Sequence, residues 1–262
     1  MNILDQIIAK KKIEVQEKRS VKNISELEKG AFFKKEVLSF KDYLLRADKT
    51  GIIAEFKRKS PSKGTINDTS SVAEVTAAYA KYGASSISVL TDEFFFGGSL
   101  NDLLELTVKN VPLLRKDFII DEYQLVESKA YGADIILLIA ACLTVEEVKG
   151  FASFAKNLGL NVLLEIHNTE ELGHICDEVD VVGVNNRDLK TFTVDINRSI
   201  DLSLQIPSDK IKISESGIDT FASIELLQKH GFKGFLMGEK FMKEKDPGMA
   251  FLNFAEKLKA RK

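Results

Sequence analysis

The sequence predicts a single (β/α)8 barrel preceded by an N-terminal helical extension. From about residue 51 onward, short runs rich in β-branched residues alternate with amphipathic stretches, a pattern typical of a parallel sheet surrounded by helices. Eight such runs can be counted, and 262 residues match the length of one α/β barrel better than two average domains. An open doubly wound sheet would typically have fewer strands and a GxGxxG motif after the first strand, and the sequence contains no such motif.

The first 50 residues differ from the rest, because they are rich in Lys and Glu and carry apolar residues at helical spacing. We therefore assign residues 1–50 to a helical extension packed on the barrel, and residues 51–262 to the barrel, as one domain overall. The extension could be a solvated helix pair that closes the N-terminal end of the barrel, or a flap that reaches the active-site mouth. The lysine run at 10–12 is expected on a solvent-exposed helical face, since Glu14 and Glu17 follow closely.

The predicted strands are short apolar runs, and a helical stretch follows each of them. They cover residues 51–57, 85–91, 111–118, 134–140, 161–166, 181–185, 210–216 and 234–238. One predicted helix spans residues 71–82 and is capped by Ser70 or Ser71. Another spans residues 144–158 and starts with a capping box formed by Thr144 and Glu147.

Composition excludes several classes of protein. The formal net charge is −2 and the pI is about 6.0, so no global attraction to nucleic acid or to an anionic membrane is expected. The N-terminus lacks the apolar core of a signal peptide, and no apolar run is long enough for a membrane helix. We expect a soluble cytoplasmic protein that acts on a small molecule.

Disulfide and metal chemistry are not expected either. The two cysteines, Cys142 and Cys176, show no CxxC spacing and are interpreted as buried packing residues. The three histidines, His167, His174 and His230, form no HxH or HExxH pattern, so each is interpreted as a surface or packing residue rather than a metal ligand.

Polar residues that end the predicted strands form the candidate active site, because the active site of such a barrel lies at the C-terminal ends of its strands. Glu55 and Lys57 are two residues apart, so both can point into the mouth of the barrel. Lysine and glutamate are rarely buried without partners, and alternating charges would supply those partners. The alternative is a polar plug that merely fills the top layer of the barrel. The whole set consists of Glu55, Lys57, Lys116, Glu165, Asn185 and Glu215, with Ser216 beside the last.

Glycines after the last two predicted strands indicate a phosphate site. Barrels often bind phosphate with backbone N–H groups in these loops, where glycine allows close approach. Gly217, Gly238 and the N–H of Glu239 fit this arrangement, provided that the Glu239 side chain points away from the phosphate. Ser60, after the first strand, could add a hydroxyl donor. Ordinary loops between strand and helix are the alternative.

Seven stretches together resemble successive signatures of the indole-3-glycerol-phosphate synthase family, in the right order and at the right spacing. They are IIAEFKRKSPSKG, SVLTDEFFFGGS, PLLRKDFIIDEYQ, VLLEIH, GVNNRDL, ISESGI and FLMGEKFM. The resemblance implies a carboxy-lyase of tryptophan biosynthesis. Such an enzyme cyclises 1-(2-carboxyphenylamino)-1-deoxyribulose 5-phosphate to indole-3-glycerol phosphate with loss of CO2 and water. It implies no metal or organic cofactor.

Roles for individual residues follow from the same resemblance. Lys116 is similar to the general acid that protonates the ribulose carbonyl, and Glu165 to the general base of the dehydration. Lys57 would hold the substrate carboxylate and is a candidate to protonate the departing hydroxyl. Positions that orient the lysines or bind substrate hydroxyls match Glu55, Asn185 and Glu215, with Arg187 and Ser216 near them. The walls that press the anthranilate ring against the ribulose carbon match Phe96, Phe118, Leu189 and Leu236.

Other functions remain open from the residues alone. A Schiff-base aldolase could use Lys116 or Lys57, and a phosphoribosylanthranilate isomerase would need a Cys and Asp pair, whereas no cysteine ends a strand suitably here. A non-catalytic phosphate-ligand binding protein would need the glycines but not the paired lysines and glutamates. We expect a monomer without nucleic-acid or membrane partners, and enzymes of the same pathway are candidate partners.

Overall fold

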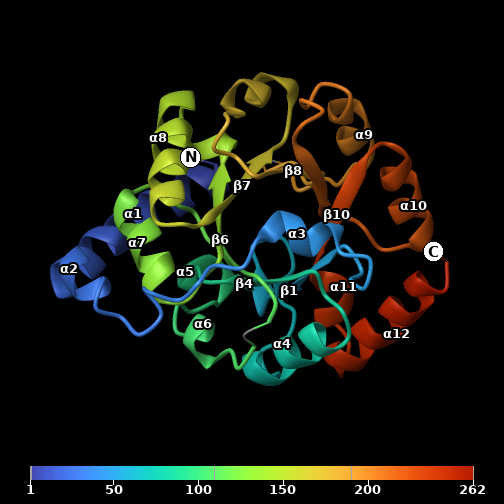
Figure 1. Ribbon diagram of the computed structural model, residues 1–262, viewed down its shortest axis with the longest axis horizontal. Helices are drawn as coiled ribbons and strands as arrows, with labels where there is room; N and C mark the ends of the chain where they lie inside the picture. The colour runs from blue at the N-terminus through green and yellow to red at the C-terminus, as the bar shows by residue number, and fades with distance from the viewer. Residues whose placement is uncertain (1, 109, 190, 262) are drawn as a thin grey trace.

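Eight parallel strands close into a barrel in the computed structural model, which describes residues 2–108, 110–189 and 191–261 (Figure 1). Neighbouring barrel strands are consecutive along the chain, and β1 closes the barrel by pairing with both β4 and β10. This confirms the predicted fold and all eight predicted strands; two have the predicted bounds, and the ends of the other six are shifted by one or two residues. The barrel strands are β1 (Ile52–Phe56), β4 (Ser86–Leu90), β5 (Leu113–Lys116), β6 (Ile135–Ile139), β7 (Asn161–Ile166), β8 (Val181–Asn185), β9 (Ile211–Glu215) and β10 (Phe232–Met237).

Two apolar layers follow from the alternation of side chains along each strand. In β1, Ile52 and Ala54 face outward and pack in the large core between strands and helices, whereas Ile53 faces inward and packs in the barrel interior. All three are fully buried. This explains why the strands read as continuous apolar runs rather than as alternating ones.

Helices surround the barrel and are placed by caps that the sequence contains. The helix α8 (Val145–Asn157) starts with the predicted capping box, in which Thr144 Oγ1 accepts the N–H of Glu147 at 3.1 Å and Glu147 accepts the N–H of Thr144 at 2.8 Å. Ser71, not Ser70, caps α4 (Val72–Lys81). The other long outer helices are α7 (Glu122–Ala130), α9 (Asn197–Ser203), α10 (Phe221–Lys229) and α12 (Pro247–Lys259).

Two connections depart from the regular alternation expected from the sequence. After β4 the chain forms two one-turn helices, α5 (Glu93–Phe96) and α6 (Asp102–Glu105), because Gly97 adopts a left-handed conformation (φ 64°) and ends α5. After β7 it forms a short 3-10 helix, η2 (Thr169–His174), in place of a long α-helix. The remaining short elements are the hairpin of β2 (Lys59–Ser60) and β3 (Gly64–Thr65), η1 (Ala140–Cys142) and α11 (Glu239–Met242).

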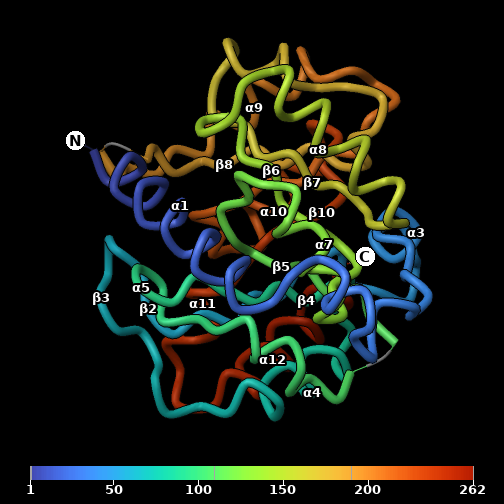
Figure 2. Tube along the Cα trace, turned by 90° about the vertical axis from the view of Figure 1, so that its left-hand side faces the viewer, coloured from blue at the N-terminus to red at the C-terminus, as the bar shows by residue number. Residues whose placement is uncertain are grey.

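The N-terminal extension covers both ends of the barrel, so each of the two alternatives describes part of it. Its helices are α1 (Ile3–Val21), α2 (Ile24–Leu27) and α3 (Phe40–Leu45). The helix α3 closes the N-terminal end, where buried Phe40 and Leu44 pack on the inward-facing core and the Phe40 N–H donates to Asn161 Oδ1 at the start of β7. The helix α1 lies on the opposite side of the molecule, with the hairpin β2–β3 (Figure 2).

Lys11 corrects the expectation that the lysine run lies on a solvent-exposed face. Its side chain is only 1% exposed, although Lys10 and Lys12 are exposed as expected. The physical reason is the helical period, since Lys11 lies one turn from each of the buried residues Ile7 and Val15 and therefore shares their face.

Two further findings concern the cysteines and membrane association. Both cysteines are free thiols, and both are half-buried rather than fully buried as expected. None of the described helices is both long enough and apolar enough to cross a membrane.

Candidate active site

A cavity at the C-terminal ends of the strands brings together most of the residues predicted from the sequence. The glycine pair, Gly217 and Gly238, lies instead on a second cavity beside it. The predicted residues that line the first cavity are Glu55, Lys57, Ser60, Phe96, Lys116, Phe118, Glu165, Asn185, Arg187, Leu189, Glu215, Ser216, Leu236 and Glu239. The polar strand ends therefore converge on one mouth, as expected from the fold.

Lys116 and Glu165 form the centre of this mouth. The Lys116 ammonium at the end of β5 lies 3.0 Å from Glu165 Oε2 on β7 and 3.6 Å from Glu215 Oε2 on β9. Asn185 at the end of β8 donates from Nδ2 to Glu165 Oε1 at 3.1 Å. Four strands thus fix one ammonium and one carboxylate in contact, and both glutamates are buried.

A second ion pair on β1 lies beside this centre. The Lys57 ammonium is 2.8 Å from Glu55 Oε1, and Glu55 is buried while Lys57 is half-buried. Gly238 is needed next to it, because a Cβ at this position would lie 2.6 Å from Glu55 Oε1 and 2.9 Å from Glu55 Cβ. The glycine after β10 therefore makes room for a carboxylate of the site.

Burial and neighbouring charges drive the two glutamates of this centre in opposite directions. Burial alone would raise the pKa of Glu165, but the Lys116 ammonium, His167 and the hydrogen bond from Asn185 together hold it far below its usual range. Burial also raises the pKa of Glu215, and the adjacent Glu165 and Glu55 carboxylates leave it at about 8. The arrangement keeps Glu165 ionised as a base and makes Glu215 the weaker acid of the two.

The lysine of the centre is held as a cation. Burial alone would lower the pKa of Lys116, yet the surrounding carboxylates of Glu165, Glu215 and Glu55 raise it above its usual range. An ammonium fixed in this way can stabilise an oxyanion that develops beside it.

The apolar walls of the mouth come from the barrel and from the extension. The rings of Phe96 and Phe118 lie with their centroids 6.0 Å apart and tilted by 37°. Sequence reasoning missed several further wall residues, although the apolar spacing along α1 hinted at some of them. They are Ile3, Leu4 and Ile7 on α1, and Leu90, Leu137 and Ile139 on the strands.

The second cavity has the features of an anion site. Gly217 (φ 71°) and Ser216 (φ 68°) both adopt left-handed conformations after β9, and both residues line the cavity. The first-turn N–H groups of α11 have no partner within the helix, because all helices leave these groups free. From the loop after β1, Ser62 and Lys63 line this cavity, whereas Ser60 lines the first one.

Glu239 departs from its expected orientation. Its carboxylate does not point away but lines both cavities. Oε1 lies 3.6 Å from the Lys63 ammonium and Oε2 lies 3.9 Å from Arg187 Nη2. The Glu239 carboxylate therefore lies between the two cations that could bind an anion, at a range where opposite charges attract.

His167 is a residue of the site that sequence reasoning assigned to packing or to the surface. It lies two residues after Glu165, is buried, and its Nε2 atom is 3.2 Å from Glu165 Oε1. The i, i+2 spacing from a strand-end glutamate was the signal that could have identified it.

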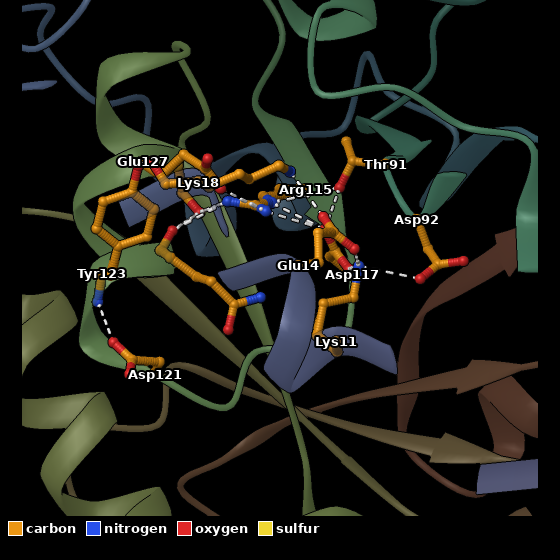
Figure 3. Close-up of polar contacts among 12 residues, drawn as sticks. Lys11, Glu14, Lys18, Thr91, Asp92, Arg115, Asp117, Asp121, Tyr123 and Glu127 are labelled. Carbon is orange, nitrogen blue, oxygen red and sulfur yellow. Dashed lines mark hydrogen bonds and ion pairs between the residues drawn. The ribbon is translucent and has the colours of Figure 1, made fainter. Parts of the chain in front are cut away.

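A buried ionic cluster anchors α1 beside the mouth (Figure 3). The Lys11 ammonium lies 2.7 Å from Glu14, 3.0 Å from Asp92 and 2.9 Å from Asp117. Asp117 follows directly after Lys116 and also accepts from Arg115 Nη2 at 2.9 Å. Asp92 caps α5, which carries Phe96, and Asp117 precedes Phe118 in the chain. Lys11 therefore links α1 to the two segments that provide the aromatic walls of the site.

Comparisons with known proteins agree with this geometry. A family model described as "Indole-3-glycerol phosphate synthase" matches residues 4–253. A protein of that name from Bacteroides thetaiotaomicron is 46% identical over 258 residues, which cover 98% of this chain and 99% of the relative. Another from Caldanaerobacter subterraneus subsp. tengcongensis is 46% identical over 246 residues, with 92% and 93% covered.

Among solved structures, the tryptophan synthase alpha subunit of Legionella pneumophila superimposes with a TM-score of 0.60 at 14% identity, covering 84% of this chain and 97% of that one. At so low an identity the likeness concerns the fold alone.

Proposed function

The chain belongs to the indole-3-glycerol phosphate synthase family, and on that premise we propose that Lys116 and Glu165 carry out the proton transfers of its ring closure. The family identifies the chain as a carboxy-lyase of tryptophan biosynthesis. The single observation that carries the proposed mechanism is the contact between the Lys116 ammonium and the Glu165 carboxylate, 3.0 Å apart at the floor of a mouth with apolar walls.

Lys116 acts first in this proposal, as the general acid. The aromatic carbon that carries the carboxylate attacks the ribulose carbonyl, a carbon–carbon bond forms, and the carbonyl oxygen takes a proton from the Lys116 ammonium. Loss of CO2 then returns the bonding electrons to the aromatic ring. Phe96 and Phe118 hold the ring against the carbonyl, because ring closure requires both reactants in contact with water excluded.

Glu165 acts second, as the general base of dehydration. It takes a proton from the new five-membered ring while the carbon–oxygen bond breaks, and the departing hydroxyl takes a proton from Lys57 and leaves as water. Glu165 is ionised and can therefore accept a proton, because Lys116, His167 and Asn185 lower the pKa of its carboxyl group. Glu55, 2.8 Å from Lys57, orients the second ammonium.

The phosphate of the substrate is assigned to the second cavity. We propose that the N–H groups of Gly217, Gly238 and Glu239 bind it, with Lys63 and Arg187 released from the Glu239 carboxylate to pair with the anion. Inorganic phosphate should then compete with the substrate. An apparent affinity that does not respond to added phosphate would count against this cavity.

Replacing Lys116 with Met and, separately, Glu165 with Gln tests the catalytic assignment. Product formation is followed by indole fluorescence without added metal, and substrate binding is measured in parallel. Turnover should collapse in both variants, while binding of the phosphorylated substrate persists. The controls are Lys233→Met, an exposed lysine on β10, and Glu170→Gln, an exposed glutamate near Glu165. Near-normal turnover of either active-site variant would show that its assigned role is wrong.

We further propose that the chain works as a monomer in the cytoplasm on a small phosphorylated substrate. A formal net charge of −2 supports a small-molecule substrate rather than a nucleic-acid or membrane partner, because it implies no attraction to nucleic acid or anionic membranes. Enzymes of the same pathway are the partners to test, by comparing the sedimentation of the chain with and without them.

A further inference from the structure

We propose that His167 is the positioning residue of the general base, an imidazolium held between Glu165 and Glu171 that keeps the Glu165 carboxylate ionised and turned toward Lys116. This inference rests on the proposed role of Glu165 as the base. It concerns a buried histidine that the mechanism above does not use.

The position of His167 follows from the strand. It comes two residues after Glu165 at the end of β7, so both side chains leave the backbone on the same side. Nε2 lies 3.2 Å from Glu165 Oε1, and Nδ1 lies 3.3 Å from Glu171 Oε2. Each ring nitrogen therefore lies near one carboxylate, an arrangement that favours the positively charged imidazolium, which carries a proton on both nitrogens.

The second carboxylate is itself fixed by the short helix η2. Glu171 Oε2 accepts the backbone N–H of His167 at 2.7 Å, and Oε1 accepts Nδ2 of Asn168 at 2.9 Å. Asn168 also caps η2, because its Oδ1 accepts the backbone N–H of Glu171 at 3.1 Å. The hydrogen bonds of this short 3-10 helix therefore fix the Glu171 carboxylate beside Nδ1 of the His167 ring.

Electrostatics favour the charged form of this histidine. Burial alone would lower the pKa of His167, but the Glu165 and Glu171 carboxylates raise it to about 9. Other ionisable groups lie around the pair. The thiol of Cys142 on η1 is close enough for both carboxylates to raise its pKa, and Asp5, Asp188 and Arg198 line the adjacent cavity together with His167. The two carboxylates in direct contact dominate, and the imidazolium persists at neutral pH.

The charge of His167 matters more than its hydrogen-bonding capacity. Nε2 is close enough to Glu165 Oε1 for an ion pair but is not aligned for a hydrogen bond. Moreover, the other cation in contact with Glu165 is Lys116, which gives up its proton when it acts as the acid. His167 then remains as the cation that keeps Glu165 anionic for the dehydration that follows.

The two oxygens of the Glu165 carboxylate have different partners. Oε1 of Glu165 is occupied by Asn185 and His167, while Oε2 faces Lys116 and the cavity. This arrangement presents one oxygen to the substrate and holds the other, so the base cannot rotate away between the two proton transfers.

Three variants and one spectroscopic measurement test the inference. His167→Gln removes the charge, Glu171→Gln removes only the carboxylate behind the ring, and Glu170→Gln is the matched control, an exposed glutamate on the same short helix. The steady-state parameters kcat and KM are measured from pH 5.5 to 9.5, and the protonation of His167 in the unaltered protein is followed by 15N NMR of its ring.

The inference predicts a distinct pH response for each variant. In His167→Gln the cation that remains beside Glu165 once Lys116 has given up its proton is lost, so kcat should fall by roughly tenfold across the whole pH range, and KM should change little. In Glu171→Gln the histidine pKa falls toward its usual value, so kcat should match the unaltered protein near pH 6 and drop by roughly tenfold near pH 8. Glu170→Gln should leave the profile unchanged.

Several results would overturn it. A neutral His167 ring at pH 7 in the unaltered protein would do so even if a variant failed to fold. A kcat equal to that of the unaltered protein at every pH in both folded variants would also do so. If Glu165→Gln loses turnover while His167→Gln behaves normally, only this inference fails. If Glu165→Gln keeps turnover, the proposed function of the base fails instead.

Discussion

Replacing Lys11 with Met should loosen the extension from the barrel and destabilise the chain. The Lys11 ammonium is buried and lies within 3.0 Å of Glu14, Asp92 and Asp117 (Figure 3). Methionine has a similar length and no charge, so the substitution leaves little cavity but removes the cation that compensates buried carboxylates.

The size of the effect follows from what each carboxylate retains. Removing one partner from a buried ion pair costs about 3–5 kcal/mol because a buried charge is left uncompensated. Asp117 keeps Arg115 and Thr91, and Asp92 keeps the N–H of Phe95. Since these partners remain, we expect the lower end of that range, a loss of about 3 kcal/mol in the free energy of unfolding.

Urea unfolding of Lys11→Met measures the loss, and hydrogen exchange over residues 3–21 shows where it acts. Lys12→Met is the matched control, because Lys12 is the exposed next residue of the same helix. The control should stay within about 0.5 kcal/mol, as is usual for surface substitutions. KM should also rise in Lys11→Met, since α1 contributes Ile3 and Ile7 to the cavity wall.

Two outcomes would refute this reasoning. Equal unfolding free energies for Lys11→Met and the unaltered chain would mean that the cluster contributes no stability. Equal losses in Lys11→Met and Lys12→Met would mean that helix propensity, rather than the buried charge, sets the effect.

Further predictions concern a glycine, a helix cap and a thiol. In Gly183→Ala the new Cβ would lie 2.4 Å from Glu215 Oε1, so we expect a stability loss of about 1–3 kcal/mol from overpacking and, as Glu215 is displaced, a kcat reduced by roughly tenfold; a normal kcat would show that the position of Glu215 does not matter. Thr144→Ala removes the capping box of α8 and should cost about 1 kcal/mol in urea unfolding with kcat unchanged; no change in the urea midpoint would mean that the cap is dispensable. Burial raises the pKa of the Cys142 thiol, so a thiol reagent at pH 8 should modify it roughly tenfold more slowly in the folded chain than in the urea-unfolded chain; equal rates would contradict this.

The fold and the strand-end residues could be predicted because both depend on local patterns. Each barrel strand is an apolar run, and the residue type that ends it, as at Lys116 or Glu165, is visible in the sequence without knowledge of any long-range contact. Closure of the barrel then brings these ends together whatever the loops do. Convergence of the site therefore required only the correct number and order of strands.

Side-chain orientation in the loops could not be predicted in the same way. The Glu239 carboxylate turns into the mouth because Lys63 and Arg187 are there, and these two residues come from distant loops. The role of His167 likewise depends on Glu171, which is held by a 3-10 helix where an α-helix was expected. Such pairings follow from tertiary contacts that strand and helix patterns do not encode.

The burial of Lys11 could have been predicted from the local spacing of apolar residues, but the neighbouring lysines indicated a solvent-exposed face instead. A lysine between two other lysines indicates a solvated face, yet spacings of four residues to Ile7 and Val15 place it in the apolar stripe of α1. On β5 the same alternation directs Arg115 outward into the ionic cluster and Lys116 inward to the mouth. Because one strand separates the two networks, substitutions in the outer one should act mainly on stability and KM, and substitutions in the inner one on kcat.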